Sequence, residues 1–204
     1  MGKRLFDLVV AGTCLVLLCP LLLAIAAWIK LDSRGPVFFR QQRVGRGGAL
    51  FRIHKFRTMR HVDAPAEASA HGPQITVGDD ARVTRAGRFL RRAKLDELPQ
   101  LIDVLAGTMS LVGPRPEVPR YVALYPPGLR DKVLSVRPGI TDPASLRFAD
   151  ESALLARAAD PEREYVDVVM PEKLAAAIAY AEQATLTSDL RVIGQTLCSL
   201  LFRR

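Results

Sequence analysis

The sequence is poor in aromatic residues, cysteine and histidine, and each shortage narrows the possible functions. Aromatic residues make up 6% of the 204 residues and do not alternate with basic ones, so we expect no base-stacking surface and no nucleic-acid partner. The three cysteines lie in apolar stretches without metal-ligand spacing, which argues against a disulfide framework and favours a reducing compartment. With only three histidines, any chemistry would have to rest on carboxylates.

The usual signatures of nucleotide-binding loops are also missing. The chain has no Walker-type phosphate loop, and no G-x-G-x-x-G follows a predicted strand. It is nonetheless basic, with 29 Lys and Arg against 21 Asp and Glu and a formal charge of +8. A basic chain needs an anionic partner, and anionic lipid or a phosphorylated substrate would serve.

Residues 8–29 form an apolar run without Asp, Glu, Lys, Arg or His. As a helix the run would be about 33 Å long, enough to cross a hydrocarbon core of about 30 Å. Lys3 and Arg4 precede the run, and Lys30 and Arg34 follow it. These flanks suit neither a cleaved signal peptide nor a straight span well, because basic residues favour the cytoplasmic side.

A helix that bends and returns to the same face fits the charges better. Pro20 lies near the middle of the run, where it cannot donate a backbone hydrogen bond and pushes against the preceding turn. The backbone groups freed by this bend need partners, and Cys19 is a weak donor for them. We therefore predict a re-entrant membrane anchor over residues 1–34 and a cytoplasmic domain over residues 35–204.

Residues 36–59 predict a β-hairpin with a basic face. Strand formers stand on both sides of a glycine-rich turn at residues 45–48. On this hairpin His54 is expected to be an ordinary polar strand residue. The next segment, residues 61–83, has the composition of a loop.

The remaining segments predict mostly helices. Residues 84–107 read as one helix, or as two helices broken near Pro99. Residues 150–182 predict polar helices, and residues 186–202 predict an amphipathic helix for the core or the membrane surface. The predicted fold class is α+β and mainly helical, with a short β-hairpin and amphipathic interfacial helices beside the anchor.

Two adjacent carboxylates, Asp96 and Glu97, stand in the stretch RRAKLDELPQL. One explanation is a helix start, because acidic side chains are favoured in the first turn of a helix. The other is a reactive pair held in a cationic site. Basic residues that would repel one another without an anion among them crowd the preceding segment: Arg85, Arg88, Arg91, Arg92 and Lys94.

Two further arginines stand beside prolines. Arg115 lies between Pro114 and Pro116, and Arg137 precedes Pro138. Proline stiffens the backbone, and a guanidinium on a rigid loop can bind phosphate with two parallel hydrogen bonds. The pattern predicts phosphate binding, with an exposed arginine in an ordinary turn as the alternative.

Four motifs in this order resemble the bacterial sugar transferases, the small monotopic phosphoglycosyl transferases. They are KFRTM (55–59), LDELPQL (95–101), SLVGPRP (110–116) and RPGIT (137–141), and they follow the apolar run with its proline. The resemblance implies transfer of a sugar 1-phosphate from a UDP-sugar to polyprenyl (undecaprenyl) phosphate, with release of UMP. It places the catalytic domain on the cytoplasmic face of the bacterial inner membrane, at the start of surface-glycan synthesis.

The resemblance also implies roles for residues. Asp96 would be the nucleophile and Glu97 its partner, and both would contact Mg²⁺. A carboxylate can attack phosphorus to give an acyl-phosphate, which divides the transfer into two steps. Cations around the pair would keep the nucleophile ionised. We expect the substrate phosphates and UMP to be bound by Lys55, Arg57, Arg88, Arg91, Arg115 and Arg137.

The main alternative is a basic scaffold at the membrane surface that binds other proteins or anionic lipid and performs no chemistry. It would leave the carboxylate pair and the Pro-Arg-Pro motif unexplained. The sequence departs from the family pattern at Cys19, at Thr108 and in ITDPASLRF after Gly139. It leaves open the sugar, the glycan pathway and whether the chain forms a homodimer.

Overall fold

The computed structural model describes residues 2–60, 80–148 and 151–202. Most of the predicted loop of residues 61–83, including Asp79, lies outside the described residues, as do Arg203 and Arg204. The described part is mainly helical with two small sheets, which confirms the predicted fold class.

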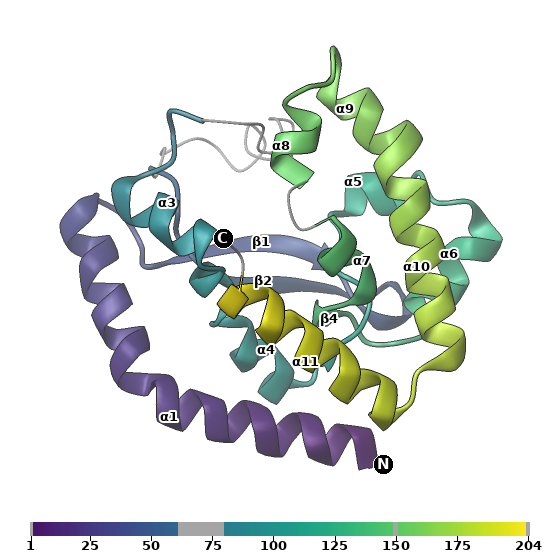
Figure 1. The fold of residues 1–204 in the computed structure, drawn as a ribbon, viewed down its shortest axis with the longest axis horizontal. Coiled ribbons are helices and arrows are strands. Elements are labelled where there is room, and N and C mark those ends of the chain that lie inside the picture. Colours follow the sequence, from purple (N-terminus) through teal and green to yellow (C-terminus); the bar gives the residue numbers. More distant parts are fainter. Residues whose placement is uncertain (1, 61–79, 149–150, 203–204) are drawn as a thin grey trace.

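The apolar run forms one helix, α1 (Gly2–Asp32), with Pro20 inside it. By length and composition α1 could cross a membrane. Its ribbon runs along the bottom of Figure 1 and then turns upward on the left. That Pro20 causes this turn, and that the helix re-enters the membrane, stay predictions.

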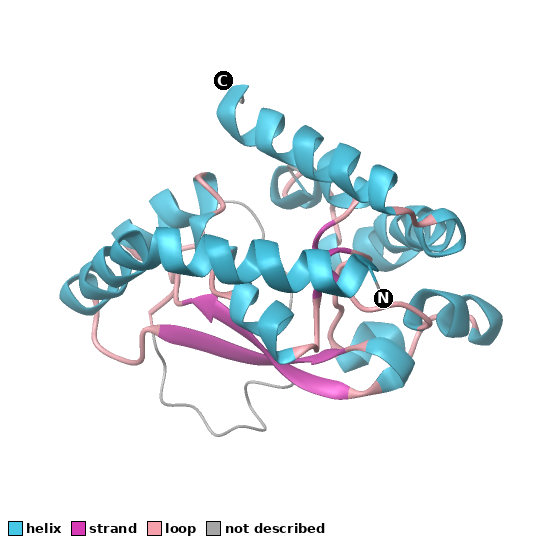
Figure 2. Ribbon diagram, turned by 90° about the horizontal axis from the view of Figure 1, so that it is seen from below, coloured by secondary structure: helices cyan, strands magenta, loops and turns pink. Residues whose placement is uncertain are grey.

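The predicted β-hairpin is confirmed. Strand β1 (Phe38–Val44) pairs antiparallel with β2 (Leu50–Phe56), from Phe38 opposite Phe56 to Val44 opposite Leu50. The turn contains a short 3₁₀ helix, η1 (Arg46–Gly48). Figure 2 shows this hairpin on one side of α1 and the C-terminal helix on the other side.

A second sheet, which the sequence did not predict, pairs β3 (Ser110–Val112) parallel with β4 (Gly139–Thr141). The backbone segments at this sheet lie so close together that two positions have no room for a side chain and are occupied by glycine. A Cβ on Gly113 would lie 2.3 Å from the carbonyl oxygen of Arg137, and a Cβ on Gly139 would lie 2.1 Å from the Gly113 nitrogen. The pairing therefore sets the course of the loop that carries Arg115.

The predicted helical stretch 84–107 forms three short elements. Helix α3 begins after Thr84, whose hydroxyl accepts a hydrogen bond from the Gly87 amide, and it ends before Lys94, a non-glycine residue with φ of 56°. The basic residues lie on or just after the first of these elements, and the carboxylate pair lies on the second. The three elements are α3 (Arg85–Arg92), η2 (Leu95–Glu97) and α4 (Gln100–Ala106).

Short helices complete the chain on the right of Figure 1, and a longer one returns toward the centre. The segment after residue 150 is helical, as predicted. The elements are α5 (Pro119–Val122), α6 (Pro127–Leu134), α7 (Pro143–Arg147), α8 (Glu151–Leu155), α9 (Pro161–Glu164), the π-helix η3 (Tyr165–Val169), α10 (Met170–Gln183) and α11 (Leu186–Phe202).

Both ends of α1 pack on the rest of the chain. Ala11 belongs to a core cluster with Val104 of α4 and Val192 of α11, whereas Ile29 belongs to another cluster with Leu90 of α3. The predicted division into an anchor (1–34) and a catalytic domain (35–204) stays a prediction. The packing shows that α1 shares hydrophobic cores with segments of the predicted catalytic domain.

A buried carboxylate inside α1 also contacts the second sheet. Asp7 is 2% exposed and accepts hydrogen bonds from the Ser110 hydroxyl (2.8 Å) and from the Leu111 amide (3.3 Å) of β3. Lys3 forms an ion pair with Asp189 of α11 and donates to the Val112 carbonyl (3.2 Å). The first turns of α1 therefore support the strand that leads to Arg115.

Candidate active site

The carboxylate pair lies on η2, between α3 and α4. The left-handed backbone of Lys94 ends the preceding helix and starts the 3₁₀ turn, and Pro99 then precedes the first residue of α4. No side chain caps α4, and the carboxylates bind cationic side chains instead. The helix-start explanation therefore does not account for the contacts of Asp96 and Glu97.

Lys55 of β2 bridges the two carboxylates. Its Nζ lies 2.9 Å from Oδ2 of Asp96 and 3.2 Å from Oε1 of Glu97. Arg115 binds Glu97 with both terminal nitrogens, and its Nη1 lies 3.1 Å from Oε2. The pair is thus held by one cation from the hairpin and one from the loop after β3.

Other contacts fix the loop that carries Arg115. Arg43 of β1 donates to the Pro116 carbonyl at 2.9 Å, and the Tyr165 hydroxyl donates to Glu117 at 2.6 Å. Gly113 also packs closely against the backbone of residues 137–139. The loop is therefore held by β1, by Tyr165 and by the second sheet. The predicted rigidity around Arg115 therefore comes from packing as well as from its two prolines.

The charges around Glu97 favour its ionised form. Burial alone would raise the pKa of Glu97, but the charges of Arg115, Lys55 and Lys94 together with the hydrogen bonds from Arg115 hold the pKa well below its usual value. The Glu97 carboxylate in turn raises the pKa of Arg115. Burial lowers the pKa of Lys94. Glu97 is therefore a carboxylate at any physiological pH.

The pair opens on a cleft of about 1030 Å³. One wall is strongly basic, and the opposite wall, from α7 to α10, carries aromatic and apolar side chains such as Phe148, Tyr165 and Leu174. Such a cleft suits a ligand with phosphates at one end. The cations of the basic wall are Arg43, Lys55, Arg88, Arg91, Arg92, Lys94 and Arg115.

Four of the six predicted phosphate ligands reach this cleft, namely Lys55, Arg88, Arg91 and Arg115. Arg91 donates from Nε to the Thr58 hydroxyl at 2.9 Å, which connects α3 to the end of the KFRTM motif. These four residues come from three separate segments and line one cleft, while their roles toward substrate stay predictions.

The structure places the other two predicted ligands at helix ends. Arg57 donates to the carbonyls of Ser33 (2.7 Å) and Arg34 (2.6 Å) after α1, and Arg137 donates to the Gly107 carbonyl (3.0 Å) after α4. Neither belongs to the described lining of the cleft. These guanidiniums therefore pair with backbone carbonyls just beyond the C-terminal ends of α1 and α4.

His54 is a polar residue of strand β2, as predicted, and it makes a further contact with α4. Its Nδ1 lies 2.7 Å from Asp103 Oδ1, and its backbone amide donates to Asp103 Oδ2 at 2.8 Å. The contact ties β2 to α4 and so fixes the strand that presents Lys55. No local sequence signal predicts the contact between His54 and Asp103, because the two residues lie far apart in the chain.

The donor chemistry of the pair fits Mg²⁺. Within the described ranges, no group of three or more His, Cys, Asp or Glu side chains could hold a metal. Mg²⁺, however, is commonly bound by one or two carboxylates together with substrate phosphates. Asp96 and Glu97 supply two such carboxylates beside a cationic cleft, so they would hold the ion jointly with the substrate.

Comparison with known proteins agrees with this site. The family model for bacterial sugar transferases matches residues 1–203. The chain is 42% identical to a UDP-glucose:undecaprenyl-phosphate glucose-1-phosphate transferase of Caulobacter vibrioides, over 98% of the chain and 69% of the relative. It is 38% identical to a protein of the same name from Xanthomonas campestris pv. campestris, over 98% of the chain but 39% of the relative.

A third relative has nearly the same length as this chain. It is an exopolysaccharide production protein of Rhizobium leguminosarum bv. phaseoli, 35% identical over 98% of the chain and 96% of the relative. The chain therefore spans about two fifths of the Xanthomonas relative but almost all of the Rhizobium relative. The family match over almost the whole sequence, with the carboxylate pair and its cations in one cleft, shows that the chain belongs to the bacterial sugar transferase family.

Proposed function

We propose that this chain transfers a sugar 1-phosphate from a UDP-sugar to undecaprenyl phosphate and releases UMP. The names of the relatives support both substrates, and the Rhizobium relative supports a role at the start of an exopolysaccharide or other surface glycan. The observation that carries the proposal is the position of Asp96. It is 2% exposed and is bound by Lys55, yet it lines the cationic cleft.

In the first step, a carboxylate oxygen of Asp96 attacks the β-phosphorus of the UDP-sugar. The bond from this phosphorus to the bridging oxygen breaks, and UMP leaves with the electron pair. The product is an aspartyl-phosphosugar. Asp96 itself is buried beside Lys55, which would limit the access of water to the carboxyl side of the anhydride.

In the second step, a phosphate oxygen of undecaprenyl phosphate attacks the same phosphorus. The bond between phosphorus and Asp96 breaks and the free carboxylate returns. Arg115 is 37% exposed even while it binds Glu97, so its guanidinium remains accessible to phosphate oxygens in both steps. Lys55 keeps Asp96 in position by its contact with Oδ2.

The proposal includes Mg²⁺ as cofactor, held by Asp96 and Glu97 together with the substrate phosphates. The bound ion would neutralise phosphate charge that otherwise repels the attacking carboxylate. Glu97 would also orient Arg115, because it accepts two hydrogen bonds from that guanidinium.

The proposal also includes a re-entrant α1 at the inner membrane, with the cleft on the cytoplasmic side. Both ends of α1 are fastened to one body: Lys3 pairs with Asp189, and Asp32 accepts a hydrogen bond from the Ala86 amide at 3.0 Å. Between these ends the helix is bare, with Val16 75% and Leu17 73% exposed. An exposed apolar middle between two docked ends suits entry and exit through the same face of a bilayer.

The test is a panel of UDP-sugars mixed with the purified protein, undecaprenyl phosphate and Mg²⁺ in lipid nanodiscs. One sugar should release UMP, and mass spectrometry should find a phosphosugar on Asp96 when the acceptor is omitted. Asp96→Asn should abolish both signals. If folded protein releases no UMP from any UDP-sugar, the proposed function is wrong and a scaffold without chemistry becomes the better explanation. Normal turnover of Asp96→Asn would instead refute Asp96 as the nucleophile.

A further inference from the structure

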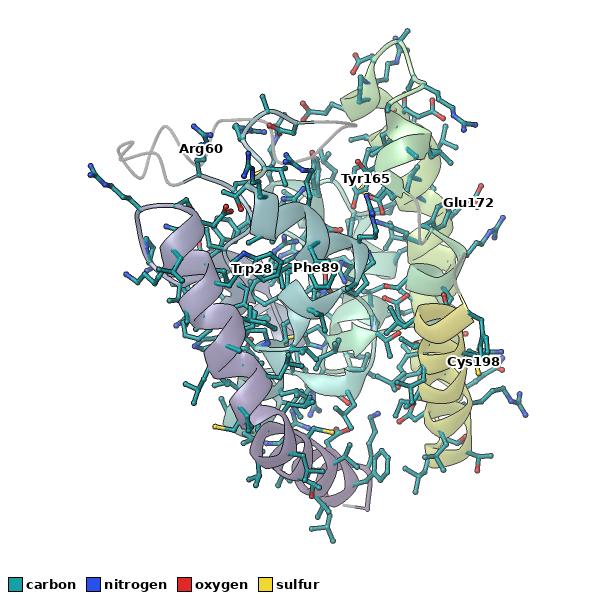
Figure 3. All side chains as sticks on the ribbon, turned by 60° about the vertical axis from the view of Figure 1, so that its left-hand side comes forward. Trp28, Arg60, Phe89, Tyr165, Glu172 and Cys198 are labelled. Atoms are coloured by element: carbon teal, nitrogen blue, oxygen red, sulfur yellow. The ribbon has the colours of Figure 1, made fainter. Side chains whose placement is uncertain are left out.

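An aromatic pair lies exposed where α1 meets α3. The rings of Trp28 and Phe89 have centroids 5.5 Å apart, and the two residues are 41% and 53% exposed. Figure 3 shows them side by side between the two helices. We call this pair the aromatic lip. Large apolar side chains left in contact with solvent as a group usually mark a binding surface.

The aromatic lip continues an apolar stripe on α1. Leu21, Ala24, Trp28 and Leu31 recur at three- and four-residue spacing, and all four are exposed. They run from the bare middle of the helix to its end at α3. A lipid chain in the bilayer would therefore find a continuous apolar path that leads to the aromatic lip.

Cations stand directly beside the aromatic lip. Arg88 and Arg92 are exposed on the same helix as Phe89, and both line the cleft that contains Asp96. Phe89 and Arg92 are three residues apart, a spacing that makes side chains neighbours on a helix. Within the described part of the chain Arg92 has no ion-pair partner, unlike Lys55 and Arg115.

We propose that the aromatic lip and Arg92 form the binding site for the polyprenyl phosphate acceptor. The first isoprene units would lie on Trp28 and Phe89, and Arg92 would bind the single phosphate at the edge of the cleft. A ligand with one long apolar chain and one phosphate matches an apolar stripe that ends in cations. A UDP-sugar has no chain to fill the stripe. The inference rests on the proposed function, because it assigns the second substrate of that reaction.

Native fluorescence gives a test that does not depend on turnover, because Trp28 is the only tryptophan in the sequence. Asp96→Asn protein in nanodiscs is titrated with undecaprenyl phosphate, with undecaprenol and with phosphatidylglycerol. We expect a saturable change in Trp28 emission with undecaprenyl phosphate and none with undecaprenol or phosphatidylglycerol. In the Asp96→Asn background, Arg92→Gln should raise the Kd by tenfold or more. An equal response to phosphatidylglycerol, or an unchanged Kd, would overturn the inference.

Kinetics of the two half-reactions give the second test. Phe89→Ser and Arg92→Gln should slow transfer from the aspartyl-phosphosugar to undecaprenyl phosphate at least tenfold more than they slow UMP release without acceptor. The matched controls are Leu129→Ser and Arg130→Gln, an exposed apolar and basic pair on α6, far from α3 in Figure 1.

The outcomes separate the two proposals. Equal loss in both half-reactions, or the same loss in the α6 controls, would show that the aromatic lip has no special role for the acceptor. Absence of UMP release by the unaltered protein would instead contradict the proposed function. Light scattering and retention in nanodiscs identify variants that have simply lost their fold or their membrane contact.

Discussion

The Nζ of Lys55 lies 2.9 Å from Oδ2 of Asp96, and the same ammonium reaches Glu97 at 3.2 Å. One cation from the hairpin therefore contacts both carboxylates. The contact joins two sequence motifs, and it explains why a β-hairpin should be part of a site whose carboxylates stand on a 3₁₀ turn.

Removal of this ammonium should therefore impair catalysis. We expect Lys55→Met to lower turnover by about 10²-fold, the cost typical of losing a preorganised charged or hydrogen-bonding group. Steady-state UMP release measures the effect. Lys132→Met is the matched control, because Lys132 forms an exposed ion pair with Glu182 on α10. Normal turnover of Lys55→Met would show that Asp96 does not depend on this contact.

Gly113 should not tolerate a side chain. Its Cβ would lie 2.3 Å from the Arg137 carbonyl oxygen, so Gly113→Ala must displace the loop that carries Arg115. We expect a loss of at least tenfold in kcat/KM together with a lower Tm. Gly128→Ala on α6 is the control, because a Cβ there meets nothing within 4 Å. Equal behaviour of the two variants would refute the proposed packing constraint.

Arg57 should act on stability more than on substrate binding. Its guanidinium binds carbonyls at the end of α1, and loss of a hydrogen bond to a charged group costs about 1.5–3 kcal/mol. Chemical unfolding of Arg57→Ala should show a destabilisation in this range. Arg52→Ala, which removes an exposed arginine of the preceding strand β2, should unfold like the unaltered protein. An unchanged stability with a raised KM for UDP-sugar would instead restore Arg57 as a phosphate ligand.

The ionisation of Glu97 should make stability depend on pH. Because the folded pKa lies below the unfolded value of about 4.3, the charge stabilises the fold fully above that value, and this contribution is lost as pH falls toward the folded pKa. The difference in unfolding free energy between the unaltered protein and Glu97→Gln should therefore shrink from pH 6 to pH 3. At neutral pH it should stay below the roughly 3–5 kcal/mol of a fully buried pair, since Arg115 is 37% exposed. A difference that does not change with pH would contradict the ion pair.

The re-entrant topology predicts the same sidedness for both ends of α1. Cysteines introduced by Gly2→Cys and Arg34→Cys, in a chain whose Cys14, Cys19 and Cys198 are replaced by alanine, should both react with an impermeant maleimide from the cytoplasmic side. Inside-out and right-side-out vesicles distinguish the faces. Labelling of the two positions from opposite sides would establish a straight span.

Local signals in the sequence predicted part of this fold correctly. The glycine-rich turn at residues 45–48 marked the hairpin, and Pro99 marked the break before α4. The meeting of the carboxylate pair with Lys55 and Arg115 in one site followed from the combination of motifs. These features depend on neighbours along the chain or on a known order of motifs.

The features that were missed depend on contacts between distant segments. Strands β3 and β4 have three residues each and lie far apart in the sequence, so neither carries a strand signal of its own. The use of Arg57 and Arg137 at helix ends was equally hidden, because an arginine in the sequence looks the same whether its guanidinium binds a phosphate or a backbone carbonyl. Only the positions of α1 and α4 decide between them.

The buried contact from Asp7 to Ser110 and Leu111 joins the docking of α1 to the assembly of the site. A chain whose first helix has not docked lacks the acceptor that β3 needs, and the loop with Arg115 loses its base. We therefore expect newly made copies whose first helix has not docked to be inactive. Under the proposed function, a nucleotide sugar would then escape cleavage until this helix is in place.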